Sequence, residues 1–236
     1  MRLLLLSNSQ TEGLRYLEHA SRDIRDFLAG VTPHAVFIPF AAVTRHYDDY
    51  LAQVQGAFGP LGIDVAGVHA EPDPVAAIRN AAIIIVGGGN TWKLLRDVRL
   101  AGLLPAIRDR VMAGTPYVGW SAGSNLACPT LMTTNDMPIC DPRGFDALGL
   151  VPFQINPHYL HGNPPGFKGE TREERIAEFG VLQPRVWVAG VREGTGLRVE
   201  GARVRLLGNA TCRVFRGTVP PRELGADASF DFLLEA

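Results

Sequence analysis

The sequence predicts an α/β fold in which a mostly parallel sheet carries helices on both faces, formed by one domain that spans residues 1–236. In the first half of the chain, short apolar runs alternate with segments whose apolar residues recur at helical spacing. Several apolar runs end directly at polar or glycine-rich turns. Such turns are expected at the carboxyl edge of the sheet, where open α/β sheets bind their ligands.

Five apolar runs are expected to form the parallel strands, because continuous apolar runs are typical of strands buried on both faces. They are residues 3–6, 35–40, 63–68, 82–86 and 115–120. The helices expected in this half of the chain are residues 14–28, 46–58, 74–80, 91–96 and 100–112. Right-handed crossovers would then bring the carboxyl ends of the strands to one edge.

The second half alternates less regularly. We expect a short strand at 153–156, a loop or lid at the glycine- and proline-rich segment 164–169, and an amphipathic helix at 171–182. Glycines separate four further short strands, which predict an antiparallel extension at the edge of the sheet. They are residues 186–191, 196–199, 203–207 and 212–215. The apolar segment 230–234 is expected to be a strand that covers an edge or a partner, so a homodimer is the assembly we favour.

Composition excludes several classes of function. The formal net charge of −1 gives no overall field that would attract nucleic acid or an anionic membrane. Three cysteines without Cys-x-x-Cys spacing argue against a disulfide framework or a thiolate zinc site, and favour the cytoplasm. No other cluster has metal-ligand spacing, so we expect neither a metal nor a cofactor. No stretch is long enough to span a bilayer.

The functional prediction starts from Gly119-Trp120-Ser121-Ala122-Gly123, a Gly-x-Ser-x-Gly turn between an expected strand and an expected helix. In a nucleophile elbow of this pattern, the serine hydroxyl stands clear of the sheet and small neighbours keep the backbone from clashing. The alternative is a serine that only caps the following helix.

A second turn, Gly87-Gly88-Gly89-Asn90, follows another expected strand at the same edge. Gly88 and Gly89, together with Ala122, are the expected N–H donors to an oxyanion. The alternative is a phosphate cradle, but the turn lacks the Lys-Ser/Thr of a P-loop and does not match Gly-x-Gly-x-x-Gly.

His158 is the expected base, because it follows the strand at 153–156 on the edge where Ser121 must lie. His161 is a weaker competitor. Asp136, in an otherwise uncharged loop, and Glu193, after a strand end, compete to orient the imidazole. The sequence does not choose between them, since Asp136 would also serve as a turn cap and Glu193 as an exposed turn residue.

Five ordered segments together resemble the peptidase E family of serine peptidases, which also contains cyanophycinase. They are Gly87-Gly88-Gly89-Asn90-Thr91, Gly119-Trp120-Ser121-Ala122-Gly123-Ser124-Asn125, Thr133-Thr134-Asn135-Asp136-Met137-Pro138, Gln154-Ile155-Asn156-Pro157-His158 and Gly169-Glu170-Thr171-Arg172-Glu173. The resemblance implies a flavodoxin-like sheet similar to that of class I glutamine amidotransferases, with Ser121 in place of their cysteine.

The resemblance also implies metal-independent hydrolysis of dipeptides with an N-terminal aspartate, Asp-Xaa, with Ser121 as nucleophile and His158 as base. Asp136 and Glu193 both match acids proposed for the family, so that alternative stays open. Arg172 matches the residue expected to bind the aspartyl carboxylate, although an ordinary helix charge paired with an adjacent glutamate is the simpler interpretation. The other functions considered are a cyanophycinase-like peptidase, an esterase and a non-catalytic phospho-ligand-binding module.

Overall fold

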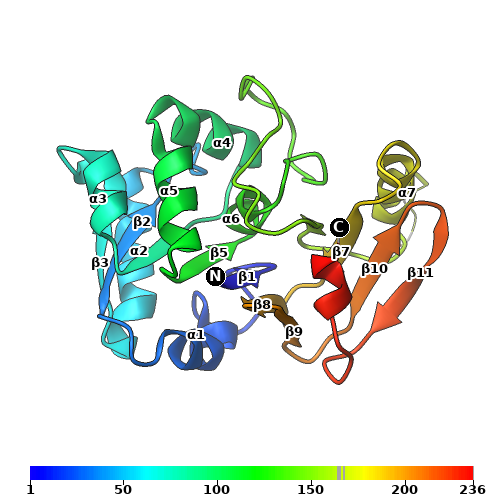
Figure 1. Ribbon diagram of the computed structural model, residues 1–236, viewed down its shortest axis with the longest axis horizontal. Coiled ribbons are helices and arrows are strands. Elements are labelled where there is room, and N and C mark those ends of the chain that lie inside the picture. Colours follow the sequence, from blue (N-terminus) through cyan, green and yellow to red (C-terminus); the bar gives the residue numbers. More distant parts are fainter. Residues whose placement is uncertain (164–165, 167, 236) are drawn as a thin grey trace.

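The computed structural model describes residues 1–163, 166 and 168–235, and within them the chain forms a mixed α/β fold (Figure 1). The central sheet of the described residues has seven strands in the order β3-β2-β4-β5-β1-β8-β9. Its parallel strands are β1 (Arg2–Leu6), β2 (His34–Ile38), β3 (Asp64–Gly67), β4 (Ile83–Val86) and β5 (Tyr117–Trp120). β8 (Gly196–Glu200) and β9 (Arg203–Leu207) extend it antiparallel beyond β1.

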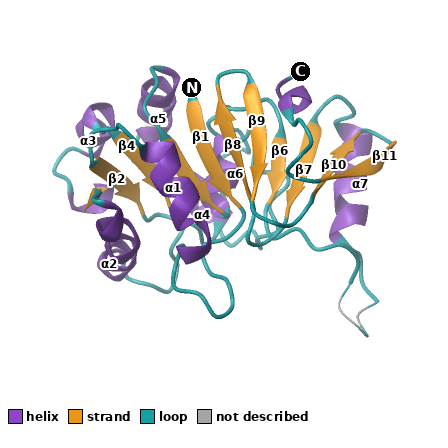
Figure 2. Ribbon diagram, turned by 90° about the horizontal axis from the view of Figure 1, so that it is seen from below, coloured by secondary structure: helices purple, strands orange, loops and turns teal. Residues whose placement is uncertain are grey.

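Helices cover both faces of this sheet (Figure 2). One face packs against α1 (Ser21–Leu28) and α2 (Tyr47–Phe58). The other face packs against α3 (Pro74–Asn80), α4 (Thr91–Leu100), α5 (Leu103–Met112) and α6 (Ala122–Ala127). β1 supplies both cores, because alternate side chains of a strand point to opposite faces: Leu3 and Leu5 enter one core, Leu4 and Leu6 the other.

A second sheet of four strands lies beyond β9 and has the order β11-β10-β7-β6. It comprises β6 (Gln154–Asn156), β7 (Trp187–Val191), β10 (Cys212–Arg216) and β11 (Val219–Leu224). Ile176 of α7 (Arg172–Leu182) packs on this sheet against Val188 and Phe215. The antiparallel extension expected from the sequence is therefore confirmed for β8 and β9, which join the edge of the central sheet. It is wrong for β7 and β10, which pair with each other in the second sheet, where β7 also pairs with β6.

Other differences have local causes. The first helix is shorter than residues 14–28, because it begins at Ser21 after the short 3-10 helix η1 (Glu18–Ala20). Strand β11 was not expected because it contains Pro220 and Pro221, which have no N–H to donate. It tolerates them because it is an edge strand and because its pairing with β10 shifts in register between Val214 and Arg216. Further 3-10 turns are η2 (Gly59–Leu61) and η3 (Val68–Ala70).

The C-terminal apolar segment is the 3-10 helix η4 (Asp231–Leu234), not a strand. It covers the edge of the central sheet at β9, where the Val204 N–H donates to Asp231 Oδ1 at 2.7 Å, and Leu233 is fully buried. The homodimer stays a prediction. Residues 164, 165 and 167 of the expected lid lie outside the described residues. No helix in the described part of the chain has the length and apolar character needed to cross a membrane.

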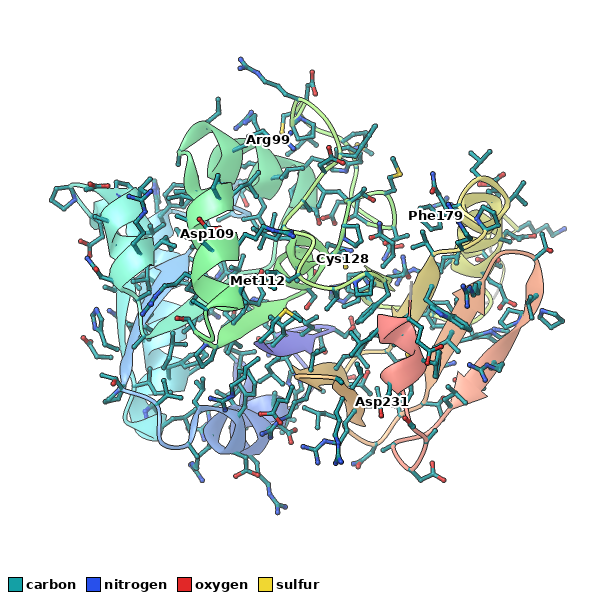
Figure 3. The ribbon with its side chains drawn as sticks, viewed as in Figure 1. Arg99, Asp109, Met112, Cys128, Phe179 and Asp231 are labelled. Atoms are coloured by element: carbon teal, nitrogen blue, oxygen red, sulfur yellow. The ribbon has the colours of Figure 1, made fainter. Side chains whose placement is uncertain are left out.

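The carboxyl ends of β4, β5 and β1 lie side by side, as the sequence predicts. Val86 pairs with Gly119, and Leu6 pairs with Trp120, the residue before the elbow serine. The long loop between α6 and β6 returns to the same edge. It is held by Arg99 of α4, whose guanidinium donates to the carbonyl oxygens of Arg143 at 2.8 Å and Asp146 at 2.7 Å (Figure 3).

Candidate active site

Ser121 occupies a strained turn between β5 and α6. Its φ of 52° and ψ of −113° lie in a region that side-chain-bearing residues rarely adopt and that costs of order 1–3 kcal/mol. Its side chain makes no capping hydrogen bond to α6. Instead, Ser121 Oγ lies 2.9 Å from His158 Nε2, so the structure favours the nucleophile over the helix cap.

The elbow fits only because its neighbours are small. A Cβ at Gly123 would overlap the carbonyl oxygen of Val86 on the adjacent strand, so the first turn of α6 can approach β4 only with glycine there. The Ser121 N–H donates to the Leu6 carbonyl at 3.1 Å. Ser124 Oγ donates to the same carbonyl at 2.7 Å, which fixes the elbow to β1.

His158 also has a positive φ, 53°, although it is not a glycine. Its backbone N–H donates to the buried Ser7 Oγ at 2.8 Å, and Ser7 Oγ donates in turn to the Val191 carbonyl at 2.8 Å. Its Nδ1 lies 2.8 Å from Glu193 Oε1. A carboxylate can only accept, so Nδ1 carries the proton and Nε2 is left to accept the hydrogen of Ser121 Oγ.

The two candidate acids lie in different places. Glu193 contacts His158, and its turn is fixed by the Gly194 N–H, which donates to Asn8 Oδ1 at 2.8 Å. Asp136 lies at the start of α4 instead, where its Oδ2 accepts the Thr91 N–H at 2.7 Å. The structure therefore brings Ser121, His158 and Glu193 together and gives Asp136 a separate position. His161 is turned toward Glu173, with Nδ1 3.0 Å from Oε2.

The Gly87–Asn90 turn lies against the elbow. A Cβ at Gly88 would be 3.1 Å from the Cβ of Ser121, so this backbone is adjacent to the hydroxyl. Asn90 N–H donates to the Ala41 carbonyl at 2.8 Å and Tyr50 OH donates to the Gly88 carbonyl at 3.0 Å, which hold the turn in place. The hydrogen bonds of the described residues do not use the N–H groups of Gly88, Gly89 or Ala122.

A cleft of about 420 Å³ opens over these groups. It is lined by Asn8, Ser9, Gln10, Tyr16, Arg45, Tyr50, Gly88, Gly89, Trp120, Ser121, Asp136, His158 and Glu193. Two carboxylates and one guanidinium are thus its charged groups within the described residues, beside the imidazole. A larger hollow of about 570 Å³ lies between Trp92 and the 138–145 loop, but Ser121 and His158 do not line it.

Arg172 is the first residue of α7, which begins at a capping box formed by Thr171 and Glu174. Its Nη1 donates to the Pro157 carbonyl at 3.4 Å, immediately before His158. Burial lowers the pKa of Arg172, and the negative charge of Glu193 opposes that shift.

The adjacent glutamates are engaged elsewhere. Glu173 pairs with Arg213 at 2.9 Å, and Glu174 Oε2 accepts from Thr171 Oγ1 at 2.9 Å. The simpler interpretation, a surface charge paired with a neighbouring glutamate, therefore does not describe Arg172. Across the described ranges, no three histidine, cysteine or acidic side chains gather as a metal-binding group.

Several residues of the site were not expected from the sequence. Ser7 and Asn8 hold His158 and the Glu193 turn, and Tyr50 and Arg45 form the wall opposite Asp136. The signal for the first two was present, because Ser7-Asn8-Ser9 follows a buried strand at the carboxyl edge. Arg45 gave no comparable signal, since it belongs to the loop before α2.

Comparisons with known proteins identify the family of this chain. The chain matches the sequence profile of Peptidase family S51 over residues 3–207. It is 54% identical over 216 residues to proteins named Peptidase E from Escherichia coli O1:K1 / APEC and Shigella boydii serotype 18, with 92% of this chain and 94% of each relative covered.

Two solved structures share the fold. One is a putative Peptidase E protein from Listeria monocytogenes EGD-e, with a TM-score of 0.68, 23% identity, and 89% of this chain and 98% of the other covered. The other is a peptidase from an acI-B1 Actinobacterium, with a TM-score of 0.70, 16% identity, and 97% and 96% covered. At these identities they support the fold, whereas the profile and the Peptidase E relatives identify the chain as a member of Peptidase family S51.

Proposed function

We propose that this chain is a serine-type dipeptidase that hydrolyses Asp-Xaa dipeptides, with Ser121 as nucleophile, His158 as base and Glu193 as the acid that orients His158. The observation that carries the proposal is the pair of contacts at His158: Nε2 to Ser121 Oγ at 2.9 Å and Nδ1 to Glu193 Oε1 at 2.8 Å. Names of relatives at 54% identity, Peptidase E, agree with this class of reaction.

The first half of the reaction forms an acyl-enzyme. Ser121 Oγ attacks the scissile carbonyl carbon while its proton passes to His158 Nε2. The carbonyl oxygen becomes an oxyanion, which accepts hydrogen bonds from the N–H groups of Gly88, Gly89 and Ala122 in this proposal. One such donor contributes about 10²–10³-fold to kcat in related chemistry. The carboxylate of Glu193 stabilises the imidazolium that forms.

The second half releases both products. The tetrahedral intermediate collapses as the C–N bond breaks, and His158 Nε2 gives its proton to the leaving amine of Xaa. Water then attacks the aspartyl ester and gives its proton to His158. The ester bond to Ser121 breaks, Ser121 Oγ recovers the proton, and free aspartate leaves.

Two charged groups suit an N-terminal aspartate. Arg172 can bind the β-carboxylate through two parallel hydrogen bonds, which would discriminate against uncharged side chains. Asp136 lines the cleft and offers a carboxylate for the α-ammonium group. Arg172 Nη1 donates to the Pro157 carbonyl at 3.4 Å, and Asn135, the neighbour of Asp136 in the chain, donates to the same carbonyl at 2.8 Å.

The same charges argue against the other functions. A phospho-ligand bound at Gly88 and Gly89 would face Asp136 and Glu193, whose carboxylates repel it. An esterase for apolar esters would not need these charges. A cyanophycinase-like peptidase needs a cleft that admits a polymer, whereas a cleft of about 420 Å³ suits a dipeptide.

We also propose that the sheet is flavodoxin-like, similar to that of class I glutamine amidotransferases. Its parallel strands follow the order β3-β2-β4-β5-β1, which is the flavodoxin order 2-1-3-4-5 when β2 is counted first and β1 last. We place the enzyme in the cytoplasm, which agrees with free thiols at Cys128, Cys140 and Cys212.

The proposal is tested with purified protein and four substrates: Asp-Leu, Leu-Leu, N-acetyl-Asp-Leu and the aspartate–arginine polymer of cyanophycin. We expect hydrolysis of Asp-Leu and a loss of at least about 100-fold in kcat/KM for Leu-Leu and the blocked peptide, since each lacks one charge that the site binds. Equal hydrolysis of all three peptides would refute the specificity. Release of soluble dipeptides from the polymer would favour the cyanophycinase alternative.

Ser121→Ala separates catalysis from binding. A peptidase loses nearly all turnover with this change, whereas a phospho-ligand module keeps its ligand affinity. Phosphate binding by the variant, measured calorimetrically, together with the absence of peptidase activity in the unmodified chain, would overturn the proposed function.

A further inference from the structure

Ser121 lies between two walls that belong to opposite faces of the central sheet. Asp136 stands on the α4 side, because its carboxylate accepts the Thr91 N–H at the start of that helix. Tyr50 stands on the α2 side and packs in the other core with Trp120. The cleft runs from one wall to the other across Ser121, so a substrate lying in it has its acyl part on one side and its leaving residue on the other.

Arg45 supplies the positive charge of the second wall. Its guanidinium carbon lies 4.4 Å from the centre of the Tyr50 ring, and the hydroxyl of that ring donates to the Gly88 carbonyl at 3.0 Å. The guanidinium is therefore about one tyrosine ring away from the turn that borders Ser121. It is exposed and lines the cleft.

The contacts of Arg45 leave most of its hydrogen-bonding capacity for a ligand. Nη1 donates to Gln53 Oε1 at 2.5 Å, whereas a guanidinium has five N–H donors. The nearby acids of α2 do not neutralise it among the described ion pairs: Asp48 pairs with His69 at 2.9 Å instead. The cleft thus presents a guanidinium on the wall opposite Asp136, where an anionic group is attracted.

We propose that Arg45 binds a carboxylate carried by the leaving residue Xaa, an inference that rests on the proposed function. With the aspartyl part between Asp136 and Arg172, Xaa extends toward Tyr50 and Arg45. The terminal carboxylate carbon of a dipeptide is about 4 Å along the chain from the scissile carbon, so this carboxylate lies on the leaving-residue side of Ser121. A carboxylate on the Xaa side chain would present the same chemistry.

The experiment compares two pairs of substrates that differ only in this charge. Asp-Ala and Asp-Ala amide differ at the terminal carboxylate, and Asp-Glu and Asp-Gln differ at the side chain. They are assayed with the unmodified chain, with Arg45→Gln and Arg45→Lys, and with Arg79→Gln as a matched control. Arg79 is an exposed arginine of α3 that does not line the cleft.

We expect the unmodified chain to favour the charged member of one pair by about 5- to 10-fold in kcat/KM, the size of a charge-assisted hydrogen bond at an exposed site. Arg45→Gln brings that ratio to about 1, mainly through KM, because the contact is made before and during the reaction alike. Arg45→Lys keeps part of the preference, and Arg79→Gln keeps all of it. Added salt lowers the ratio of kcat/KM between the charged and the neutral substrate in the unmodified chain, because it screens the guanidinium.

The two pairs of substrates distinguish the terminal carboxylate of Xaa from a carboxylate on its side chain. A collapsed ratio for Asp-Ala and its amide assigns Arg45 to the terminal carboxylate, and a collapsed ratio for Asp-Glu and Asp-Gln assigns it to the side chain. If Arg45→Gln leaves both ratios as they were, or lowers hydrolysis of all four substrates equally while the thermal midpoint holds, the proposal is wrong. If the unmodified chain hydrolyses none of the four, the proposed function itself has failed.

Discussion

Glu193→Gln and Asp136→Asn should affect different kinetic constants, although both remove one negative charge from the same cleft. Glu193 contacts the base, with Oε1 2.8 Å from His158 Nδ1, and acts on the imidazolium that exists only during the reaction. Asp136 contacts the start of α4 and lines the cleft, and in the proposed function it binds the ammonium group of the substrate before the reaction begins. We expect Glu193→Gln chiefly to lower kcat and Asp136→Asn chiefly to raise KM.

The size of each effect follows from charge and exposure. Two unit charges about 4 Å apart attract by about 4 kcal/mol at an effective dielectric constant of about 20, and by about 1 kcal/mol in water. The Glu193 side chain is 61% exposed and that of His158 35%, so solvent screens the pair. We therefore expect the Glu193 carboxylate to stabilise the His158 imidazolium by about 1.5–3 kcal/mol. Losing this stabilisation corresponds to a loss of about 10- to 150-fold in kcat.

For Asp136→Asn, losing a charge-assisted hydrogen bond to the ammonium group predicts a rise in KM of about 10- to 100-fold. The amide oxygen of asparagine can still accept the Thr91 N–H, so the hydrogen bond to the start of α4 should be kept. Folding is therefore expected to change little, and thermal unfolding of the variant checks this.

The assay is the steady-state hydrolysis of Asp-Leu by both variants, followed by the appearance of free leucine. Asp141→Asn is the control, because it makes the same change in the same loop without lining the cleft. The division of roles is wrong if both variants lower kcat to the same extent at constant KM. It is also wrong if Asp136→Asn lowers kcat and Glu193→Gln raises KM.

Three further outcomes are expected. Arg172→Gln should lower kcat/KM for Asp-Leu about 10- to 100-fold but leave that for Asn-Leu nearly unchanged, which a two-substrate assay detects; an equal loss for both would contradict its role. Ser7→Ala leaves the His158 N–H without its buried acceptor, so we expect a loss of about 1–3 kcal/mol in the free energy of unfolding and a fall in kcat larger than any change in KM; unchanged values of both would contradict it. Burial raises the pKa of the Cys128 and Cys212 thiols to about 12, above the value of about 8.5 in the unfolded chain. The contribution of these protonated thiols to the free energy of unfolding should therefore be complete below about pH 8.5 and fall as the pH rises toward 12. Each thiol contributes about 1.4 kcal/mol per pH unit in that range, and urea unfolding between pH 8 and 11 should show a shallower decline in a double alanine variant.

The sequence predicted the carboxyl edge well because that edge depends on local patterns. Apolar runs located the strands that end at Val86 and Trp120, and the β4–β5 pairing then brought Gly88 beside Ser121 as expected. His158 was predicted for the same reason, since a strand end at the correct edge places the residue that follows it.

The acid could not be chosen from the sequence, because the choice depends on pairing between distant segments. Glu193 reaches His158 only because β7 pairs parallel with β6, so that two strand ends meet. Asp136 had an equally suitable local setting, but its carboxylate accepts the Thr91 N–H at the start of α4, a contact across 45 positions of the chain. The second sheet was not predicted for a similar reason: the sequence of short strands separated by glycines does not indicate which strands pair with one another.

The end of β1 explains how three segments from different parts of the fold form one site. Its carbonyl at Leu6 accepts the Ser121 N–H at 3.1 Å, Ser7 Oγ accepts the His158 N–H at 2.8 Å, and Asn8 Oδ1 accepts the Gly194 N–H, next to Glu193, at 2.8 Å. Three consecutive residues thus hold the proposed nucleophile, the proposed base and the neighbour of the proposed acid against one strand end. Ser121 and His158 have a positive φ although neither is a glycine, a conformation that persists only where surrounding contacts fix it. The strain at the elbow and at the base is therefore maintained by β1, which links the first strand of the chain directly to the proposed chemistry.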